Sequence, residues 1–134
     1  MRKALTCLIV DDMQNIRMVT KQILLNLGCG SVLEASTGEE ALKLLSIHAV
    51  DLVLLDMVLP QMSGIACLQA IRSNPKTSHI RCVIITSDRV ESHVREAIAA
   101  GAAGYVVKPF SPRTLEAHLD LALADRDKAM QKSS

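Results

Sequence analysis

The sequence predicts an α/β domain of the (βα)₅ type, in which five parallel strands form a sheet with helices on both faces. Two observations lead to this fold class. Five short apolar runs, most of them rich in valine, isoleucine and leucine, are spread along the 134 residues, and segments with helical spacing separate them. Continuously apolar runs are typical of strands buried on both faces, and helical connections between them imply a parallel sheet with right-handed crossovers.

The first half of the chain is predicted to contain three strands and two helices. The apolar runs that predict the strands are residues 5–10, 31–35 and 52–55. Apolar residues recur at i, i+3, i+7, i+8 and i+11 from Ile16, and Gly28 follows them as the residue that ends the first helix. Residues 37–40 have the sequence of a capping box, which opens a second helix to about Ile47.

The third and fourth helices are predicted from residues 65–101. Apolar residues at positions 65, 68 and 71 mark the third helix, which has to end before Pro75 because the residue before a proline disfavours the helical conformation. Residues 88–91 predict the start of the fourth helix, and Gly101 closes it. The strands that precede and follow this helix are predicted at residues 82–85 and 105–107.

The fifth helix ends the predicted domain. Ser111 supplies an N-cap and Pro112 a proline at the first helical position, and apolar residues continue at helical spacing to Leu123. We therefore expect one domain over residues 1–124. Residues 125–134 have mixed charge and end in Lys-Ser-Ser, so we expect a frayed C-terminal tail.

The composition argues against several classes of protein. Hydrophobic residues make up 49% of the chain, but only one tyrosine, one phenylalanine and no tryptophan are present, so we expect an aliphatic core. The net charge of +1 argues against a broad nucleic-acid interface. The N-terminal residues do not resemble a signal peptide, and no apolar run approaches the roughly 20 residues that span a bilayer. We expect a cytoplasmic protein without membrane insertion or direct nucleic-acid binding.

The four cysteines are expected to be reduced and buried. Cys7, Cys29, Cys67 and Cys82 include no C-x-x-C pair and no histidine at metal-binding spacing. Cys7 and Cys82 lie within apolar runs, where a reduced cysteine behaves as a small hydrophobic residue. Structural thiols are therefore favoured over a redox site.

Residues with a carboxylate, hydroxyl or amine side chain lie at the end of four of the five predicted strands. Asp11 and Asp12 follow the first, Asp56 follows the third, Thr86 ends the fourth, and Lys108 follows the fifth. In an open parallel sheet, ligands bind beyond the carboxyl ends of the strands. We therefore expect three acids, one hydroxyl and one amine to converge at one edge of the sheet.

Three carboxylates in one place indicate a bound cation. Taken alone, an aspartate after a strand is usually a turn or cap residue. Three together repel one another unless a cation lies among them. Clustered oxygen ligands suit Mg²⁺, which often takes one or two carboxylates together with phosphate oxygens. The sequence therefore predicts Mg²⁺ as the cofactor.

Four stretches around these residues indicate a family. They read LIVDD at residues 8–12, LLDMVLPQMSG at 54–64, IITS at 84–87 and GAAGYVVKPF at 101–110. With these motifs in order over residues 4–124, the chain resembles the response-regulator receiver domains of two-component signalling, and most of all their single-domain chemotaxis type. The resemblance implies a flavodoxin-like three-layer sandwich with strand order 2-1-3-4-5. It also implies a signalling domain that catalyses only its own phosphorylation and slow dephosphorylation.

The resemblance assigns the acids to phosphoryl transfer. Asp56 is expected to be the nucleophile that takes a phosphoryl group from the phosphohistidine of a sensor histidine kinase. Asp11, Asp12 and Asp56 are expected to bind Mg²⁺ together with the backbone carbonyl of Val58, and one of the first two often acts through water. Phosphoryl transfer requires mainly positioning and neutralisation of charge, which a metal ion and an ammonium can supply.

The resemblance also implies a switch. The hydroxyl of Thr86 is expected to bind the phosphoryl group, and Lys108 to pair with it. Tyr105 is expected to turn inward as Thr86 moves, so that the surface of the fourth helix, fifth strand and fifth helix changes and controls a partner. The bond between Lys108 and Pro109 is often cis in this family.

Two positions leave the lifetime of the phosphate open. Val58 and Asp88 lie two residues beyond Asp56 and Thr86, at places that tune this lifetime in the family. An aliphatic Val58 cannot orient a water molecule, whereas Asp88 can repel or activate one. The direction of the combined effect stays open.

Two other classes of protein share parts of this pattern. Phosphohydrolases of the haloacid dehalogenase type also place an aspartate nucleophile after a parallel strand, but they have a D-x-D motif, and Val58 stands where the second acid would be. A flavin-binding module of the same topology has a phosphate loop rich in glycine, serine and threonine, which residues 11–16 lack.

The pathway is the open part of the interpretation. A stand-alone, chemotaxis-like switch is the first choice because the sequence stops after its fifth helix and residues 103–110 resemble that subgroup. The alternatives are an intermediate in a phosphorelay and a receiver that regulates another protein or an output domain. The corresponding partners are a flagellar motor protein, a histidine phosphotransfer protein, or neither.

Overall fold

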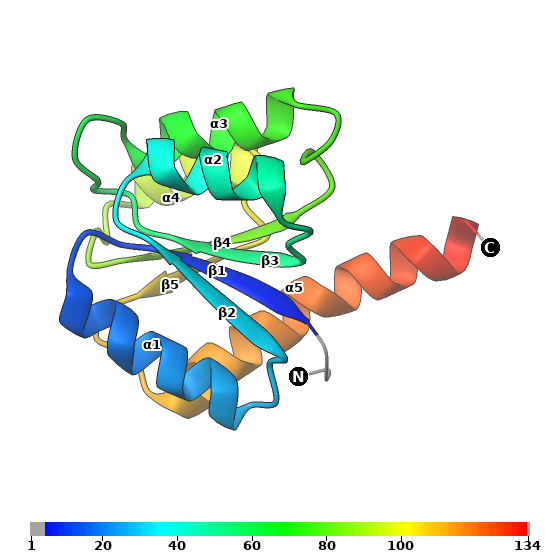
Figure 1. The fold of residues 1–134 in the computed structure, drawn as a ribbon, viewed down its shortest axis with the longest axis horizontal. Coiled ribbons are helices and arrows are strands. Elements are labelled where there is room, and N and C mark those ends of the chain that lie inside the picture. Colours follow the sequence, from blue (N-terminus) through cyan, green and yellow to red (C-terminus); the bar gives the residue numbers. More distant parts are fainter. Residues whose placement is uncertain (1–4, 134) are drawn as a thin grey trace.

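The computed structural model describes the backbone of residues 5–133 and the side chains up to residue 124. Strands and helices alternate along the chain, which confirms the predicted (βα)₅ order (Figure 1). The elements are β1 (Thr6–Val10), α1 (Gln14–Asn26), β2 (Ser31–Ala35), α2 (Gly38–Ile47), β3 (Leu52–Leu55), α3 (Gly64–Ser73), β4 (Arg81–Thr86), α4 (Glu91–Ala99), β5 (Gly104–Val107) and α5 (Pro112–Ser133).

All five strands form one parallel sheet in the order β2-β1-β3-β4-β5, as the resemblance implied. The chain turns to one side of β1 to form β2 and to the other side to form β3. The carboxyl ends of β1 and β3 therefore lie at the topological switch point, where open α/β sheets bind their ligands.

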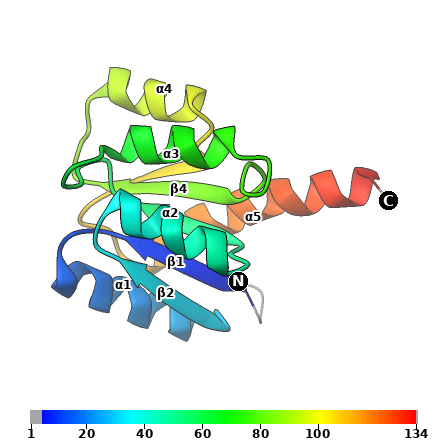
Figure 2. The ribbon, with the colours of Figure 1, turned by 45° about the horizontal axis from the view of Figure 1, so that its top comes forward.

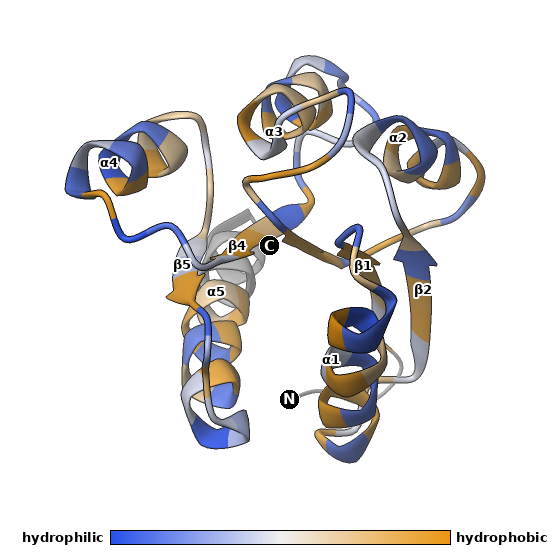
Figure 3. Cartoon of the chain, turned by 90° about the vertical axis from the view of Figure 1, so that its left-hand side faces the viewer, coloured by the Kyte–Doolittle hydropathy of each residue, from blue (hydrophilic) through white to orange (hydrophobic). Residues whose placement is uncertain are grey.

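The helices cover both faces of the sheet, so the domain has three layers (Figures 1 and 3). Helices α2, α3 and α4 lie on one face, and α1 and α5 lie on the other. This division follows from the alternation of side chains along each strand. Leu8 and Val10 of β1 pack toward α2 and α3, whereas Cys7 and Ile9 pack toward α1 and α5.

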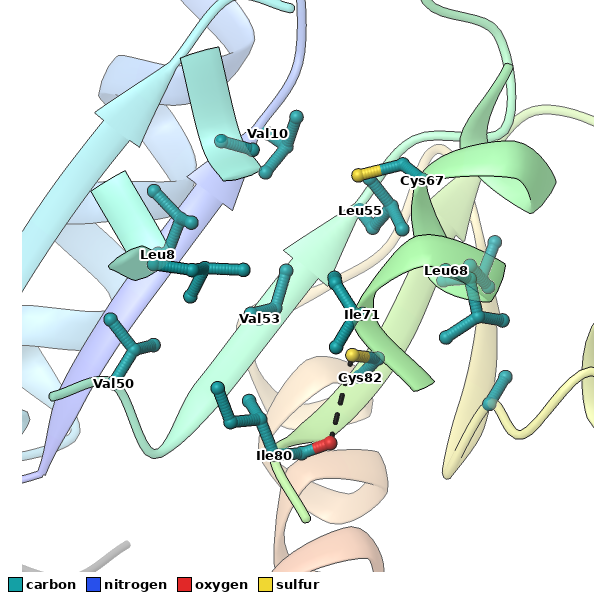
Figure 4. Packing of buried hydrophobic residues seen from close by; sticks show 14 of the residues in the cluster. Leu8, Val10, Val50, Val53, Leu55, Cys67, Leu68, Ile71, Ile80 and Cys82 are labelled. Atoms are coloured by element: carbon teal, nitrogen blue, oxygen red, sulfur yellow. Dashed lines mark hydrogen bonds between the residues drawn. The ribbon is translucent and has the colours of Figure 1, made fainter. Parts of the chain in front are cut away.

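The core is aliphatic on both faces of the sheet, as the composition predicts. One cluster joins the sheet to α2 and α3 through residues such as Val53, Leu68 and Ile71 (Figure 4). The other joins it to α5 through Leu115 and Leu119, both fully buried. Burying a leucine or isoleucine side chain contributes about 1.5–3 kcal/mol. These two clusters therefore hold the strand ends, and the loops that follow them, in place.

Most helix ends have the predicted local signals. The side chain of Thr37 accepts a hydrogen bond from the backbone N–H of Glu40 at 3.0 Å, as its capping box predicts. Gly28 and Gly101 follow α1 and α4 with φ angles of 100° and 107°, which favour glycine. Helix α4 begins at Glu91, at the end of the predicted start region.

Helix α5 continues past the predicted end of the domain. Its backbone is helical to Ser133 and extends beyond the sheet (Figure 2), while the fraying expected for residues 125–134 stays a prediction. The boundary at residue 124 stays a prediction, and residues 1–4 and 134 lie outside the described residues. Within residues 5–133, no helix combines the length and the apolar character that crossing a bilayer requires.

Candidate functional site

Three acids meet at the carboxyl edge of the sheet. Asp11 and Asp12 directly follow β1, and Asp56 directly follows β3. Because β1 and β3 are hydrogen-bonded neighbours, the three carboxylates each place an oxygen within 4.8 Å of the others. Asp11 is 3% exposed and Asp56 is 8% exposed, while Asp12 is open to solvent. The structure therefore brings together the three acids that the sequence predicts to converge.

Lys108 lies between the two buried acids. Its Nζ donates hydrogen bonds to Oδ2 of Asp11 at 2.7 Å and to Oδ2 of Asp56 at 2.9 Å. Burial disfavours the ammonium, but the hydrogen bonds and charges of Asp11 and Asp56 outweigh it and raise the pKa of Lys108 above its ordinary value. Lys108 therefore remains positively charged at neutral pH.

The backbone orients the second oxygen of each buried acid. Oδ1 of Asp56 accepts the N–H of Val58 at 3.0 Å, and Oδ1 of Asp11 accepts the N–H of Met13 at 2.9 Å. The backbone of Asp56 also donates to the carbonyl of Val10 at 3.0 Å. Each carboxylate is thus held by its own loop, which leaves its Oδ2 directed at the lysine.

Gly64 fixes the loop that carries Asp56. Its N–H bonds the carbonyl of Met57 at 2.9 Å, which brings the start of α3 against the loop after β3. A Cβ atom at Gly64 would lie 2.2 Å from the carbonyl oxygen of Asp56. Only glycine can occupy this position without moving the loop. The motif at residues 54–64 contains this glycine, but sequence reasoning assigned it no role.

Thr86 and Tyr105 are joined through Asp88. Thr86 is 1% exposed, and its Oγ1 lies 3.4 Å from the backbone nitrogen of Asp88. The hydroxyl of Tyr105 donates to the backbone carbonyl of Asp88 at 2.8 Å. Burial and the charges of Asp88 and Asp56 raise the pKa of Tyr105, so the hydroxyl keeps its proton. The two expected switch residues therefore contact one loop.

The side chain of Asp88 orders the same loop. Its Oδ1 accepts the N–H of Val90 at 2.9 Å, and its Oδ2 lies 2.6 Å from Nδ1 of His93 in α4. These hydrogen bonds, first that of the Val90 backbone and then that of His93, lower the pKa of Asp88. The sequence placed Asp88 at the predicted start of the fourth helix and two residues beyond Thr86, but it did not predict the contact of its side chain with His93.

Arg17 is a second residue that the sequence did not single out. Its Nη1 donates to the backbone carbonyl of Asp11 at 2.6 Å, and its Nε donates to Glu34 of β2 at 3.2 Å. The guanidinium thereby ties α1 and β2 to the loop that carries the acid pair. No local pattern marks this role, because Glu34 comes from another strand.

The remaining predicted residues lie at the rim of the site. Val58 is 71% exposed, while its backbone N–H is bonded to Asp56. The peptide bond between Lys108 and Pro109 is cis. The backbone N–H of Lys108 bonds the carbonyl of Thr86 at 2.8 Å, which joins the ends of β4 and β5 beside the acids.

The donor set fits a divalent cation. Asp11, Asp12 and Asp56 offer carboxylate oxygens within a span that one ion can bridge. Three carboxylates against the single ammonium of Lys108 leave an excess of two negative charges in a partly buried place. Mg²⁺ prefers hard oxygen ligands and keeps several waters, and exposed Asp12 leaves the site open to solvent.

Comparisons with known proteins agree with this geometry. The protein-family model described as "Response regulator receiver domain" matches residues 7–120 of this chain. Over 120 residues the chain is 37% identical to the chemotaxis protein CheY-3 of Vibrio cholerae, covering 90% of this chain and 92% of that protein.

Two solved structures have the same fold. A CheY-like response regulator receiver domain protein from Methanospirillum hungatei matches with a TM-score of 0.86 and 29% identity, over 95% of this chain and 99% of that one. The receiver domain of a sensor histidine kinase from Pseudomonas aeruginosa matches with a TM-score of 0.76 and 23% identity, over 84% of this chain and 92% of that one. That receiver domain has a magnesium ion coordinated in its active-site cleft.

Proposed function

The chain belongs to the response-regulator receiver family, and on this premise we propose that it is a switch controlled by phosphorylation of Asp56 in the presence of Mg²⁺. The phosphoryl donor is the phosphohistidine of a sensor histidine kinase. Asp11, Asp12, Asp56 and the backbone carbonyl of Val58 bind the metal. The protein acts on no other substrate and catalyses only its own phosphorylation and slow dephosphorylation.

The observation that carries the proposal is the pairing of a buried aspartate with a partly buried lysine inside an acidic cluster. Asp56 is 8% exposed, and Lys108 Nζ lies 2.9 Å from its Oδ2. When bound, Mg²⁺ supplies positive charge that offsets the acids and the incoming phosphoryl group. The magnesium ion in the Pseudomonas receiver domain supports this choice of metal.

Each residue has a distinct part in the transfer. An ionised oxygen of Asp56 attacks the phosphorus, so that an O–P bond forms as the P–N bond of the phosphohistidine breaks and the imidazole leaves. Lys108 stays protonated beside Asp56 and donates hydrogen bonds to the phosphoryl oxygens. Positioning and neutralisation of charge contribute most of the catalysis in such a loose transition state.

The response starts at the loop between β4 and α4. A phosphoryl group adds about 1.5–2 negative charges at pH 7, and it recruits the hydroxyl of Thr86. Thr86 then gives up its contact with Asp88, whose carbonyl holds the hydroxyl of Tyr105. Tyr105 and α4 rearrange together, and the surface of α4, β5 and α5 changes. Shifting this equilibrium from 1:99 to 99:1 requires about 5.5 kcal/mol of preference for the active state.

The output that we propose is a stand-alone, chemotaxis-like response. The match to a chemotaxis protein over 92% of that protein's length supports this choice. A phosphorelay intermediate is the alternative, and a receiver that controls another protein or an output domain is a further one. Binding of the phosphorylated protein to a flagellar motor protein, to a histidine phosphotransfer protein or to neither separates these three outputs.

The test is phosphorylation of the full chain by phosphoramidate with and without Mg²⁺, followed by intact mass spectrometry. We expect one added phosphoryl group that requires Mg²⁺ and is absent in Asp56→Asn. Asp51→Asn is the matched control, because Asp51 accepts the N–H of Thr6 at the opposite end of the sheet and an asparagine oxygen can still accept it. Phosphorylation of Asp56→Asn to the wild-type level would refute the proposal.

A further inference from the structure

Two of the four cysteines bring their sulfur atoms into contact. Cys7 lies in β1, and Cys29 lies between α1 and β2, 22 positions further along the chain. Both are buried free thiols, and their Sγ atoms are 3.0 Å apart. This distance is shorter than the roughly 3.5–4.0 Å at which even carbon atoms make their best contact. The fold therefore holds the two sulfur atoms closer together than ordinary packing contacts would.

Backbone hydrogen bonds hold Cys29 in this position. Its N–H bonds the carbonyl of Leu24 at 3.0 Å, and the next two N–H groups both bond the carbonyl of Leu5. The Sγ of Cys29 also lies 3.2 Å from the carbonyl oxygens of Leu5 and Ser31. Because these bonds fix the loop against the start of β1, the two sulfurs stay together without a covalent link.

We propose that Cys7 and Cys29 form a site of reversible oxidation, at which a hydroperoxide converts the two thiols into an intramolecular disulfide. The sulfurs need to approach by about 1 Å to reach the disulfide length of roughly 2.05 Å. Gly28 and Gly30 flank Cys29, and glycine allows the backbone to make such an adjustment.

The reaction proceeds in two balanced steps. The sulfur of Cys29 attacks one oxygen of hydrogen peroxide, so that an S–O bond forms, the O–O bond breaks, and a sulfenic acid and water result. The sulfur of Cys7 then attacks the sulfenic sulfur, and the hydroxyl leaves with the proton of Cys7 as a second water. The two thiols lose two electrons and two protons in total, which the peroxide takes up.

Exposure sets the order of the two steps. Cys29 is 6% exposed, whereas Cys7 is fully buried at 0%. Burial, together with the hydrogen bond from Cys29, raises the pKa of Cys7 and disfavours its thiolate, which is the reactive form of a thiol. Cys29 therefore meets the peroxide first, and Cys7 reacts with the oxidised sulfur that lies beside it.

The other two cysteines provide an internal control. Cys67 and Cys82 are free thiols that are 0% exposed, as Cys7 is, and burial raises their pKa values to about 12 and about 11. Their sulfurs contact backbone carbonyls instead. The sulfur of Cys67 lies 4.0 Å from the carbonyl of Gly38. That of Cys82 lies 3.7 Å from the carbonyl of Ile80 (Figure 4). If the contact with Cys29 had no effect on oxidation, Cys7 would react no faster than these two thiols.

The test treats the full chain, reduced and freed of reductant, with hydrogen peroxide at low protein concentration. Remaining thiols are then alkylated, and the protein is digested without reduction and analysed by mass spectrometry. We expect the intact chain to lose two hydrogen atoms and one pair of peptides to be joined through Cys7 and Cys29. Dithiothreitol should restore both thiols, while Cys67 and Cys82 are alkylated throughout.

Two variants and a denatured sample complete the test. Cys29→Ser should not lose the two hydrogen atoms, whereas Cys67→Ser should lose them as the wild type does. In denaturant the pairing should become unselective. The proposal is overturned if Cys7 and Cys29 remain fully alkylatable after peroxide, if Cys29 stops at a sulfinic acid, or if Cys67 and Cys82 cross-link in equal yield. Equal selectivity in denaturant would also overturn it.

Discussion

Lys108 Nζ lies 2.9 Å from Oδ2 of Asp56, although 52 positions separate the two residues in the sequence. The same ammonium lies 2.7 Å from Asp11. Lys108 therefore compensates part of the negative charge at the sheet edge, and any cation that binds the acids has to share that charge with it.

Replacing Lys108 with methionine should tighten binding of Mg²⁺. The ammonium repels a nearby divalent cation, and removing one positive charge at this range should increase the affinity by about tenfold. Isothermal titration calorimetry with MgCl₂ measures the change. Lys43→Met on the exposed side of α2 is the control and should bind as the wild type does. Weaker binding by Lys108→Met would mean that the lysine serves mainly to hold the acids in place.

The contribution of Lys108 to stability should depend on pH. Despite burial, the hydrogen bonds to Asp11 and Asp56 raise its pKa above the ordinary value of 10.5. A group whose pKa is raised on folding stabilises the protein at lower pH and loses this effect as the pH rises through the folded pKa. The difference in free energy of unfolding between wild type and Lys108→Met should therefore be constant near neutral pH and shrink above about 10.5. Urea titrations across this range check the trend, and a difference that grows with pH would contradict it.

Gly64→Ala should disrupt the loop of Asp56. The new Cβ would lie 2.2 Å from the Asp56 carbonyl oxygen and 2.6 Å from Cα of Met57, and both are backbone atoms. We expect a loss of about 2–4 kcal/mol in the free energy of unfolding, together with poor phosphorylation. Gly104→Ala is the control, since its Cβ would meet Val83 at an ordinary 3.6 Å. Equal stability of the two variants in urea unfolding would exclude this steric account.

Arg17→Met should loosen the loop that carries the acid pair. The guanidinium is mostly buried and bonds both the carbonyl of Asp11 and the carboxylate of Glu34, so its loss should cost about 1.5–3 kcal/mol of stability. The affinity for Mg²⁺ should fall as well. Arg95→Met removes an exposed pair with Glu91 and should cost less than about 0.5 kcal/mol. Urea unfolding and calorimetry compare the two variants, and equal effects would mean that Arg17 does not position the site.

Tyr105→Phe should free the loop between β4 and α4 while leaving phosphorylation intact. The variant removes only the hydrogen bond to the Asp88 carbonyl, which is worth about 1 kcal/mol. Amide exchange at Asp88 and Val90 should accelerate by about fivefold, as measured by NMR. Tyr105→Ala should keep phosphorylation as well but weaken binding of the phosphorylated protein to its partner. A drop in the yield of acyl phosphate in either variant would place Tyr105 in the transfer step itself.

The local features of the fold could be predicted from the sequence. The apolar runs, the capping box at Thr37 and the glycines at 28 and 101 act within a few residues of themselves. The location of the site could also be predicted, because parallel strands place the residues that follow them at one edge of the sheet. From the sequence alone, this rule predicts that Asp11, Asp56 and Lys108 lie close together.

Contacts between distant elements were decided only by the tertiary structure. Arg17 reaches Glu34 because α1 packs beside β2, and Cys7 meets Cys29 because the chain returns to the start of β1. Gly64 is required because its backbone lies against that of Asp56. Such pairs depend on strand register and on the rotation of each helix against the sheet. These are set by packing over the whole core, so periodicity and capping, which act within a few residues, carry no information about them.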